Sequence, residues 1–240
     1  MEHKMKIKAI LFDLDGTLLP MNQDEFLKAY FAGIAEHLSH YGYNPGELIG
    51  AINAGTRAML KNDGGVTGEV AFWKAFGEKI GKNARKDEPY FEEFYLKKFP
   101  SIHTTCGCNP RSRELLDLLH QKGVKTALAT NPVFPRIATL ERIRWAGLTP
   151  NDFEYITTYE NSRFCKPRTE YYSEVAEKIG VSPEECLMVG NDVGDDMPAM
   201  NLGMRVFLLT DCLINTKNED ISAYPHGDFG ALFEFINKLI

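Results

Sequence analysis

The chain has 240 residues, of which 44% are hydrophobic and 25% are charged, a composition typical of a globular protein large enough to bury a core. Its 27 basic and 33 acidic residues give a formal net charge of −6, and no stretch rich in lysine and arginine stands out, which argues against nucleic acid as a partner. No secretory signal precedes the first apolar run, and no segment is long enough to cross a bilayer. We therefore expect a cytoplasmic protein that does not bind membranes.

The first apolar run, residues 7–12, is the feature around which the rest of the chain is organised. It is too short for a typical helix and is followed by Asp13, Asp15 and Gly16, so it predicts a strand buried on both faces. If extended geometry continues, both carboxylates leave the strand on the same side, where their like charges need a cation or a shared proton. The alternative is an ordinary Asp-Gly surface turn, and this segment alone does not distinguish the two.

Residues 22–99 change to helical spacing and contain no strand-like run. Glycine and proline divide this stretch into predicted helices. The predicted breaks are Gly42 with Pro45, residues 62–65, and Gly81. A last helix is predicted near residues 89–99, so the stretch indicates a module of about four helices.

From Pro110 onward, predicted helices and strands alternate. The expected helices are 111–121, 135–145, 169–179, 197–202 and 229–239, and the expected strands are 124–129, 153–157, 186–189 and 204–209. This alternation indicates right-handed crossovers and a parallel sheet covered on both faces. We therefore predict an α/β fold, a doubly wound, Rossmann-like parallel sheet formed by residues 1–19 and 106–240, with an all-helical domain of residues 20–105 inserted into it.

Five cysteines, an odd number, are scattered along the chain and do not indicate a disulfide framework. His103, Cys106 and Cys108 lie close together, but a structural zinc site would normally need a second pair of ligands, and none appears. We interpret them as part of a link between the helical module and the sheet, with reduced thiols. Gly107 and Pro110 make this link a candidate hinge.

Polar residues follow four of the predicted strands, at the edge where open parallel sheets bind ligands. In chain order they are Asp13 and Asp15, Thr130 and Asn131, Lys166, and residues 191–196. Each group alone could be turn or capping chemistry. Together, in this order, they predict one site made of carboxylates, a hydroxyl group and a lysine.

These residues resemble the four motifs of the haloacid dehalogenase-like hydrolase (HAD) superfamily, and the resemblance covers the whole chain. Residues 13–17 match the first motif, a nucleophilic Asp, any residue, Asp, Gly, and Thr or Val. Thr130 matches the second motif, Lys166 followed by Pro167 matches the third, and the acidic cluster matches the fourth. The helical module resembles the family's cap domain of the first type. The resemblance implies a phosphatase-type member but does not specify its substrate.

By this resemblance the chain is a phosphoric monoester hydrolase that forms an aspartyl-phosphate. Asp13 would be the nucleophile and a metal ligand. Asp15 would contribute its backbone carbonyl to the metal and act as general acid and then base. Asp192 would complete the protein ligands. Mg²⁺ is the expected cofactor, because a phosphate dianion among several carboxylates and a single lysine needs a hard divalent cation.

The remaining site residues would bind and position the phosphoryl group. Thr130 and the amide of Asn131 would bind its oxygens, Lys166 would neutralise charge on Asp13 and on the phosphate, and Asp196 would hold Lys166. Asn191 would be a secondary metal ligand. It stands where many family members have Asp directly after the fourth-motif glycine, so we expect Asp192 to be the main ligand. The segment before Lys166 also lacks the glycine that family members often have there. This difference bears on the local shape of the loop more than on the role of Lys166.

Three functions stay open at this point. The first is a Mg²⁺-dependent phosphatase for a small phosphorylated metabolite, as a monomer or weak homodimer. The others are a phosphomutase of the same superfamily and a non-catalytic binding protein on this fold, although the complete catalytic set argues against the latter. Dehalogenase chemistry is disfavoured, because relatives that perform it resemble this chain less at Asp15 and need no metal. Arg57 and Lys61 could meet an anionic substrate, but a solvated helix face is the simpler interpretation.

Overall fold

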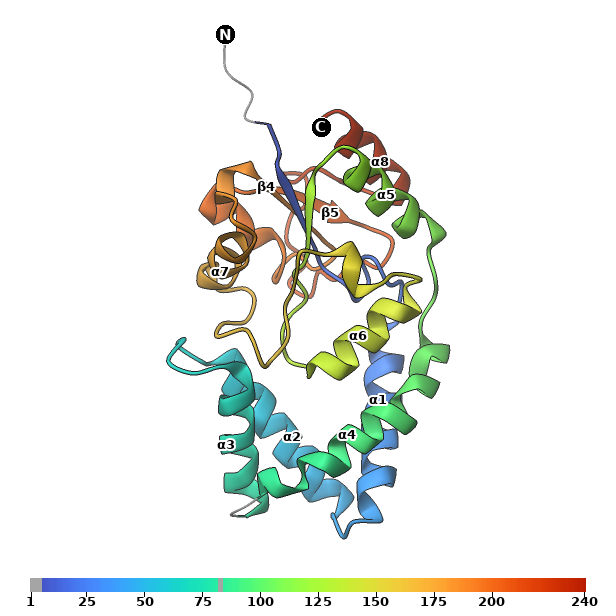
Figure 1. The fold of residues 1–240 in the computed structure, drawn as a ribbon, viewed down its shortest axis with the longest axis vertical. Coiled ribbons are helices and arrows are strands. Elements are labelled where there is room, and N and C mark those ends of the chain that lie inside the picture. Colours follow the sequence, from blue (N-terminus) through green and yellow to red (C-terminus); the bar gives the residue numbers. More distant parts are fainter. Residues whose placement is uncertain (1–5, 82–83) are drawn as a thin grey trace.

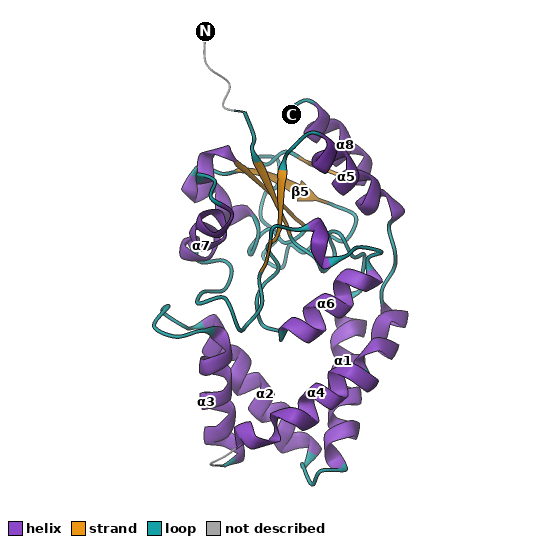
Figure 2. Cartoon of the chain, in the orientation of Figure 1, coloured by secondary structure: helices purple, strands orange, loops and turns teal. Residues whose placement is uncertain are grey.

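The computed structural model describes residues 6–81 and 84–240, which form one lobe around a parallel sheet and a second lobe of helices (Figure 1, Figure 2). Within these residues the sheet has six strands in the order β3-β2-β1-β4-β5-β6, all paired in parallel. The strands are β1 (Ala9–Phe12), β2 (Lys125–Leu128), β3 (Tyr155–Ile156), β4 (Cys186–Gly190), β5 (Arg205–Leu209) and β6 (His226–Gly227). The predicted α/β class and doubly wound sheet are confirmed.

Strand β1 lies between β2 and β4 and is completely buried. Ile10 and Phe12 contact the hydrophobic core on one face of the sheet, whereas Ala9 and Leu11 contact the core on the other. Because both faces are covered, the strand has to be apolar throughout. The chain proceeds outward from β1 in both directions, so the carboxyl ends of β1 and β4 flank the switch point where such sheets bind ligands.

Helices cover both faces of the sheet (Figure 1). One face is covered by α5 (Pro110–Gln121), α6 (Arg136–Trp145) and α8 (Phe229–Asn237), and the other by α7 (Thr169–Ile179) and the 3₁₀ helix η5 (Met197–Leu202). Two short 3₁₀ turns, η3 (Pro150–Asp152) and η4 (Pro183–Glu185), lead into β3 and β4. Helix α7 shows how apolar periodicity predicts a helix that packs on the sheet. Its residues Tyr171, Val175 and Ile179 recur at helical spacing and are all buried.

The helical lobe is inserted between β1 and β2. It consists of α1 (Gln23–Ser39), α2 (Pro45–Leu60), α3 (Gly68–Ile80), the 3₁₀ turn η1 (Ala84–Asp87), α4 (Glu88–Lys97) and the 3₁₀ helix η2 (Phe99–Thr105). Asn22, Asn44 and Thr67 cap α1, α2 and α3 by accepting hydrogen bonds from backbone N–H groups. None of the helices in the described ranges is both long and apolar enough to span a membrane.

Aromatic side chains join this helical insert to the sheet lobe. The ring of Phe99 stacks on that of Trp145 in α6, with the ring centroids 5.0 Å apart. Phe134, which precedes α6, meets the rings of Phe26 and Tyr30 edge-on, at centroid distances of 6.1 and 5.3 Å. The insert and the sheet lobe therefore share one apolar interface beside the carboxyl ends of the strands.

The two links between the insert and the sheet lobe run side by side. The N–H of Gly107 donates to the carbonyl of Pro20 at 2.7 Å, and Met21 pairs with Cys106 in an antiparallel bridge. The domain boundaries at 19/20 and 105/106, and a hinge at this point, remain predictions. All five cysteines are free, as expected, and their positions leave no disulfide in the described chain.

The structure differs from the sequence-based expectations in several local features. Pro45 begins α2 rather than ending the preceding helix, because the first helical position needs no N–H donor. The segment 197–202 is a 3₁₀ helix rather than an α-helix, and β3 is only two residues long. Strand β6 was not expected, since His226 and Gly227 form no apolar run and add only a short outer strand.

Candidate active site

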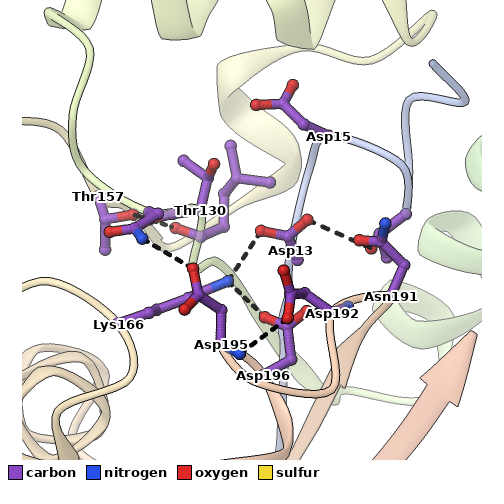
Figure 3. A network of polar contacts seen from close by, with 12 residues as sticks. Asp13, Asp15, Thr130, Thr157, Lys166, Asn191, Asp192, Asp195 and Asp196 are labelled. Atoms are coloured by element: carbon purple, nitrogen blue, oxygen red, sulfur yellow. Dashed lines mark hydrogen bonds and ion pairs between the residues drawn. The ribbon is translucent and has the colours of Figure 1, made fainter. Parts of the chain in front are cut away.

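Lys166 bridges two carboxylates at the end of the central strand. Its Nζ lies 2.8 Å from Oδ1 of Asp13, which directly follows β1, and 2.6 Å from Oδ1 of Asp196 (Figure 3). All three side chains are buried. Burial works to lower the pKa of Lys166, but the charges of Asp13 and Asp196 together outweigh it and hold that pKa well above its usual value. Lys166 is therefore a permanent ammonium group beside Asp13.

The loop after β4 is built to hold Asp196 against Lys166. The second oxygen of Asp196 accepts the backbone N–H of Asp192 at 2.9 Å. A Cβ atom on Gly190 would lie 2.1 Å from the Asp196 carboxylate, so only glycine fits there. Burial raises the pKa of Asp196, the charge of Lys166 opposes this, and that of Asp13 adds to it. Lys166 thus has a fixed partner besides Asp13, which orients its amine toward the site.

Asp15 points away from the Lys166 pair, as Figure 3 shows. Its Oδ2 forms an ion pair with Nη1 of Arg142 in α6. The Arg142 side chain is only 1% exposed. Its guanidinium lies over the ring of Phe134, 4.5 Å from the ring centre. Oδ1 of Asp15 is buried without a hydrogen-bond partner. Burial is the largest influence on the pKa of Asp15 and raises it, Arg142 opposes the shift, and Asp13 adds to it.

The expectation that Asp13 and Asp15 project the same way is therefore wrong for their side chains. Gly16 adopts a φ of +85°, and the chain turns sharply after the strand. Each carboxylate then finds its own cation, Lys166 for Asp13 and Arg142 for Asp15. The repulsion inferred from the sequence is thus relieved by two basic residues on different elements.

The threonine of the first motif ties Asp13 to the loop after β4. Oγ1 of Thr17 lies 3.3 Å from Oδ2 of Asp13 and 3.0 Å from Oδ1 of Asn191. Nδ2 of Asn191 donates to the carbonyl of Cys212 at 2.7 Å. A Cβ on Gly16 would lie 2.3 Å from this amide, so the close approach of Asn191 is a second reason for glycine at that position. Asn191 is thereby fixed next to the proposed nucleophile.

Thr130 and Asn131 follow β2 at the opposite side of the pocket. The carbonyl of Thr130 accepts hydrogen bonds from the hydroxyl groups of Thr157 and Tyr171, both at 2.7 Å, which fixes the end of the strand. Nδ2 of Asn131 donates to Oδ2 of Asp195 at 3.0 Å, while Oδ1 of Asn131 is buried without a partner. This buried, unpaired oxygen can still accept a hydrogen bond from a bound molecule.

The residues predicted to act in catalysis, to bind the phosphoryl group or to hold the metal all line one pocket of about 180 Å³. They are Asp13, Asp15, Thr130, Asn131, Lys166, Asn191, Asp192 and Asp196, and Asp195 joins them. Phe26 and Leu27 of the insert close the pocket on the other side. Arg57 in α2 and Lys61 directly after it are exposed and line neither this pocket nor the cavity beside it. The structure brings the predicted residues together, whereas their individual chemical roles remain predictions.

The predicted metal ligands supply only oxygen. Among the described residues, no three or more His, Cys, Asp or Glu side chains are grouped as a ready metal site. The expected set does not need such a group, because it combines the carboxylates of Asp13 and Asp192 with the backbone carbonyl of Asp15. Oδ1 of Asp192 is fixed by the N–H groups of Gly194 and Asp195, at 2.7 and 3.1 Å. Such hard oxygen donors fit Mg²⁺.

Sequence reasoning missed Arg142 and the bridging position of Thr17. Arg142 gives no sequence signal of its own, because arginine is common on exposed helix faces. One clue was available, since Arg142 lies four residues after Ala138 and therefore on the buried side of α6. Thr17 was identified only as part of the first motif, and its hydrogen-bonding role requires knowing that Asn191 lies next to it.

Comparison with known proteins identifies the family. A model of the haloacid dehalogenase-like hydrolases matches residues 7–202. A phosphoglycolate phosphatase of Nitrosospira multiformis is 26% identical over 224 residues, covering 93% of this chain and 90% of that protein. One from Agrobacterium fabrum is 27% identical over 192 residues, covering 80% and 75%.

The fold is also found among solved structures. A HAD-superfamily hydrolase of subfamily IA from Geobacter sulfurreducens superimposes with a TM-score of 0.55 at 20% identity, covering 97% of this chain and 100% of that one. The helical insert between β1 and β2 agrees with the cap of the first type expected in that subfamily. Because the family match spans most of the chain, including all four strand ends of the site, this protein belongs to the haloacid dehalogenase-like hydrolases, and its relatives include phosphatases.

Proposed function

We propose that the protein is a Mg²⁺-dependent phosphatase that hydrolyses a small phosphorylated metabolite through an aspartyl-phosphate on Asp13. The observation that carries this proposal is the arrangement at the end of β1. There a buried carboxylate meets a buried lysine that Asp196 holds in place. Such a carboxylate would attack phosphorus, and the ammonium group would lower the repulsion between the two anions.

The first step would transfer the phosphoryl group to Asp13. Lys166 would neutralise charge on the incoming phosphate, and the hydroxyl of Thr130 with the amide of Asn131 would bind the phosphoryl oxygens. Mg²⁺, held by Asp13, the Asp15 carbonyl and Asp192, would supply the remaining positive charge. Thr17 would keep Asp13 aligned, since its hydroxyl lies within 3.3 Å of the nucleophile's second oxygen.

Asp15 would move protons in both steps. A carboxyl group whose pKa is raised by burial can hold a proton for the leaving alkoxide and afterwards accept one from the attacking water. Its ion pair with Arg142 turns it away from Asp13 in this structure (Figure 3). The reaction would therefore require Asp15 to rotate toward the leaving oxygen, and its unpaired Oδ1 could make the first new contact.

A panel of phosphate monoesters, assayed for release of inorganic phosphate with and without Mg²⁺, tests the proposal. We expect Mg²⁺-dependent release from at least one ester and none from the Asp13→Asn variant. Chromatography of the organic products distinguishes a phosphomutase, which would return the phosphate to the substrate. Release that persists in the folded Asp13→Asn protein, or no release from any ester, would contradict the proposal.

A further inference from the structure

A second cavity, of about 240 Å³, opens beside the catalytic pocket between the helical insert and the sheet lobe. Helices α1–α4 of the insert all contribute to it, and the segments after β2 and β3 complete it. Leu27, Val133 and Phe134 line both cavities. A molecule whose phosphate lies beside Asp13 would therefore extend past these three side chains into the second cavity.

The second cavity is walled by aromatic rings and carries no charge. Tyr30, Phe72, Trp73, Tyr95 and Tyr159 contribute rings, and none of the lining residues in the described chain is charged. Burial raises the pKa of Tyr30 to about 12, so that phenol also stays neutral. Moving an ionised carboxylate into such surroundings without a partner is costly.

Three hydroxyl groups of the cavity already have partners. The hydroxyl groups of Tyr30 and Tyr95 bond to each other at 2.9 Å, and the hydroxyl of Thr56 donates to the carbonyl of Ile52 at 3.0 Å. Arg142 reaches the junction over the ring of Phe134, but Asp15 already engages it. Among the lining side chains, the amide of Asn53 and the buried, unpartnered Nε1 of Trp73 are left for a ligand. A polyhydroxylated sugar would thus lose most of its hydrogen bonds to water.

We infer that the natural substrate is a phosphate monoester of an alcohol with an apolar, ring-sized group, which this cavity receives. This inference rests on the proposed phosphatase function and specifies its substrate class. The size fits, because an apolar cavity of roughly 150 Å³ is sufficient for a benzene-sized molecule. Phosphoglycolate, named as the substrate of two relatives, carries a carboxylate that this cavity would disfavour.

The first test measures binding rather than turnover, so it does not depend on catalysis. Calorimetric titration with Mg²⁺ present compares three non-hydrolysable ligands: 3-phenylpropylphosphonate, propylphosphonate and 2-carboxyethylphosphonate. We expect the phenyl compound to bind about 10- to 100-fold more tightly than the propyl compound, from burial of the ring. The carboxyethyl compound should bind most weakly. Equal affinities, a preference for the carboxylate, or no binding of any ligand would overturn the inference.

A pair of variants on α2 locates the effect. Thr56→Lys places an ammonium group in the cavity and should reduce the phenyl preference at least about tenfold while favouring the carboxyethyl ligand. Leu60→Lys adds the same charge on the same helix at a residue that is 42% exposed and lines neither cavity, so it should retain the wild-type preference. The same phenyl preference in both folded variants would overturn the assignment of the phenyl group to this cavity. If Thr56→Lys does not fold, the comparison of the three phosphonates with the wild-type protein still tests the inference.

Turnover of the matching esters separates this inference from the proposed function. The values of kcat/KM for 3-phenylpropyl phosphate and propyl phosphate are compared, because their leaving alcohols have similar acidity. Phosphate release without a phenyl preference would overturn the cavity's role and leave the phosphatase intact. A phenyl preference in binding without release from any ester would contradict the phosphatase proposal and support the cavity.

Discussion

The catalytic pocket and the aromatic cavity share three residues but have opposite chemistry. The carboxylates of the pocket form ion pairs, Asp13 with Lys166 and Asp15 with Arg142 of α6. The cavity next to it contains no charged lining residue in the described chain, and the hydroxyl groups of Tyr30 and Tyr95 pair with each other. Different elements also form the two sites. The pocket is formed mainly by residues at the ends of strands, and most of the cavity is formed by helices of the insert.

Under the two proposals above, reaction and substrate choice are separable in this protein. The carboxylate proposed to attack phosphorus is fixed by the sheet, whose central strand is buried on both faces. The proposed leaving group would meet the insert, where an apolar side chain can change without disturbing an ion pair. Variants that damage one region and spare the other therefore test the separation directly.

The largest effect is expected from Asp13→Asn, which removes the proposed nucleophile. Asparagine is nearly isosteric but a poor nucleophile, so kcat should fall by about 10⁴-fold or more. Binding of 3-phenylpropylphosphonate should survive, because the cavity is unchanged. Kinetics, calorimetry and a mass measurement that excludes deamidation check this. Appreciable turnover by the intact, folded variant would show that another group attacks phosphorus.

Asp15→Asn is expected to have the next largest effect, and one that depends on the leaving group. Without a general acid, an alkyl phosphate should be hydrolysed roughly 10²- to 10⁴-fold more slowly. A nitrophenyl ester should lose less in its first step, because its leaving oxygen needs no proton. Hydrolysis of the aspartyl-phosphate would still be slow, so rapid-quench kinetics should show a phosphoenzyme burst.

Mg²⁺ affinity of Asp15→Asn should stay nearly unchanged, because only the backbone carbonyl of Asp15 is expected to bind the metal. Equal slowing with both esters and no burst would mean that another group moves the proton. In that case the ion pair with Arg142 would be the main role of the Asp15 side chain.

The same contrast explains how much could be predicted from the sequence. Asp13, Lys166 and Asp196 are polar residues at the ends of apolar strands, so they stand out and their meeting follows from the parallel sheet. Residues of the cavity such as Tyr30 and Phe72 repeat at helical spacing and look like ordinary core. Only the packing of four helices against the sheet lobe reveals that their faces leave a space.

Local conformations also divide into those that the sequence predicts and those that depend on distant partners. The buried strand β1 and helix α7 follow from periodicity alone, because their apolar faces are continuous. Strand β6 and the rotation of Asp15 depend on partners far away in the sequence. Arg142 lies 127 residues from Asp15. No local pattern in the chain connects such distant residues, so the pairing of Asp15 was not foreseeable.

Variants of Asp192 and Asn191 examine the metal end of the pocket. Asp192→Ala should raise the Mg²⁺ concentration needed for half-maximal activity by roughly 10- to 100-fold. Asn191→Ala should raise it less, since an amide oxygen attracts Mg²⁺ more weakly than a carboxylate. Activity titrated against Mg²⁺ for both proteins decides this. A larger shift for Asn191→Ala would mean that the fourth motif is out of register by one residue, a reading that the bond from Thr17 to Asn191 would then support.

The smallest effects are expected in the cavity wall and concern stability. Tyr30→Phe leaves the buried hydroxyl of Tyr95 without its partner, which should cost about 1–3 kcal/mol of unfolding free energy. The double variant Tyr30→Phe/Tyr95→Phe should recover part of this, because no polar group is then left unpaired. Denaturant titrations of the three variants, including Tyr95→Phe, form a double-mutant cycle. Purely additive losses would mean that the two hydroxyl groups do not stabilise each other.

Tyr30 and Tyr95 should also make the free energy of unfolding depend on pH in the alkaline range. Burial raises the pKa of Tyr30 from 10.0 to about 12, so between these pH values the folded protein binds more protons than the unfolded chain. The stabilising contribution is therefore complete below pH 10 and is lost as the pH rises toward 12. Removing both hydroxyl groups should make the alkaline loss of stability shallower than in the wild type. An unchanged slope between pH 10 and 12 would mean that the cavity is hydrated well enough to ionise its phenols freely. An aromatic leaving group would then find a wetter site than the packing of these rings indicates.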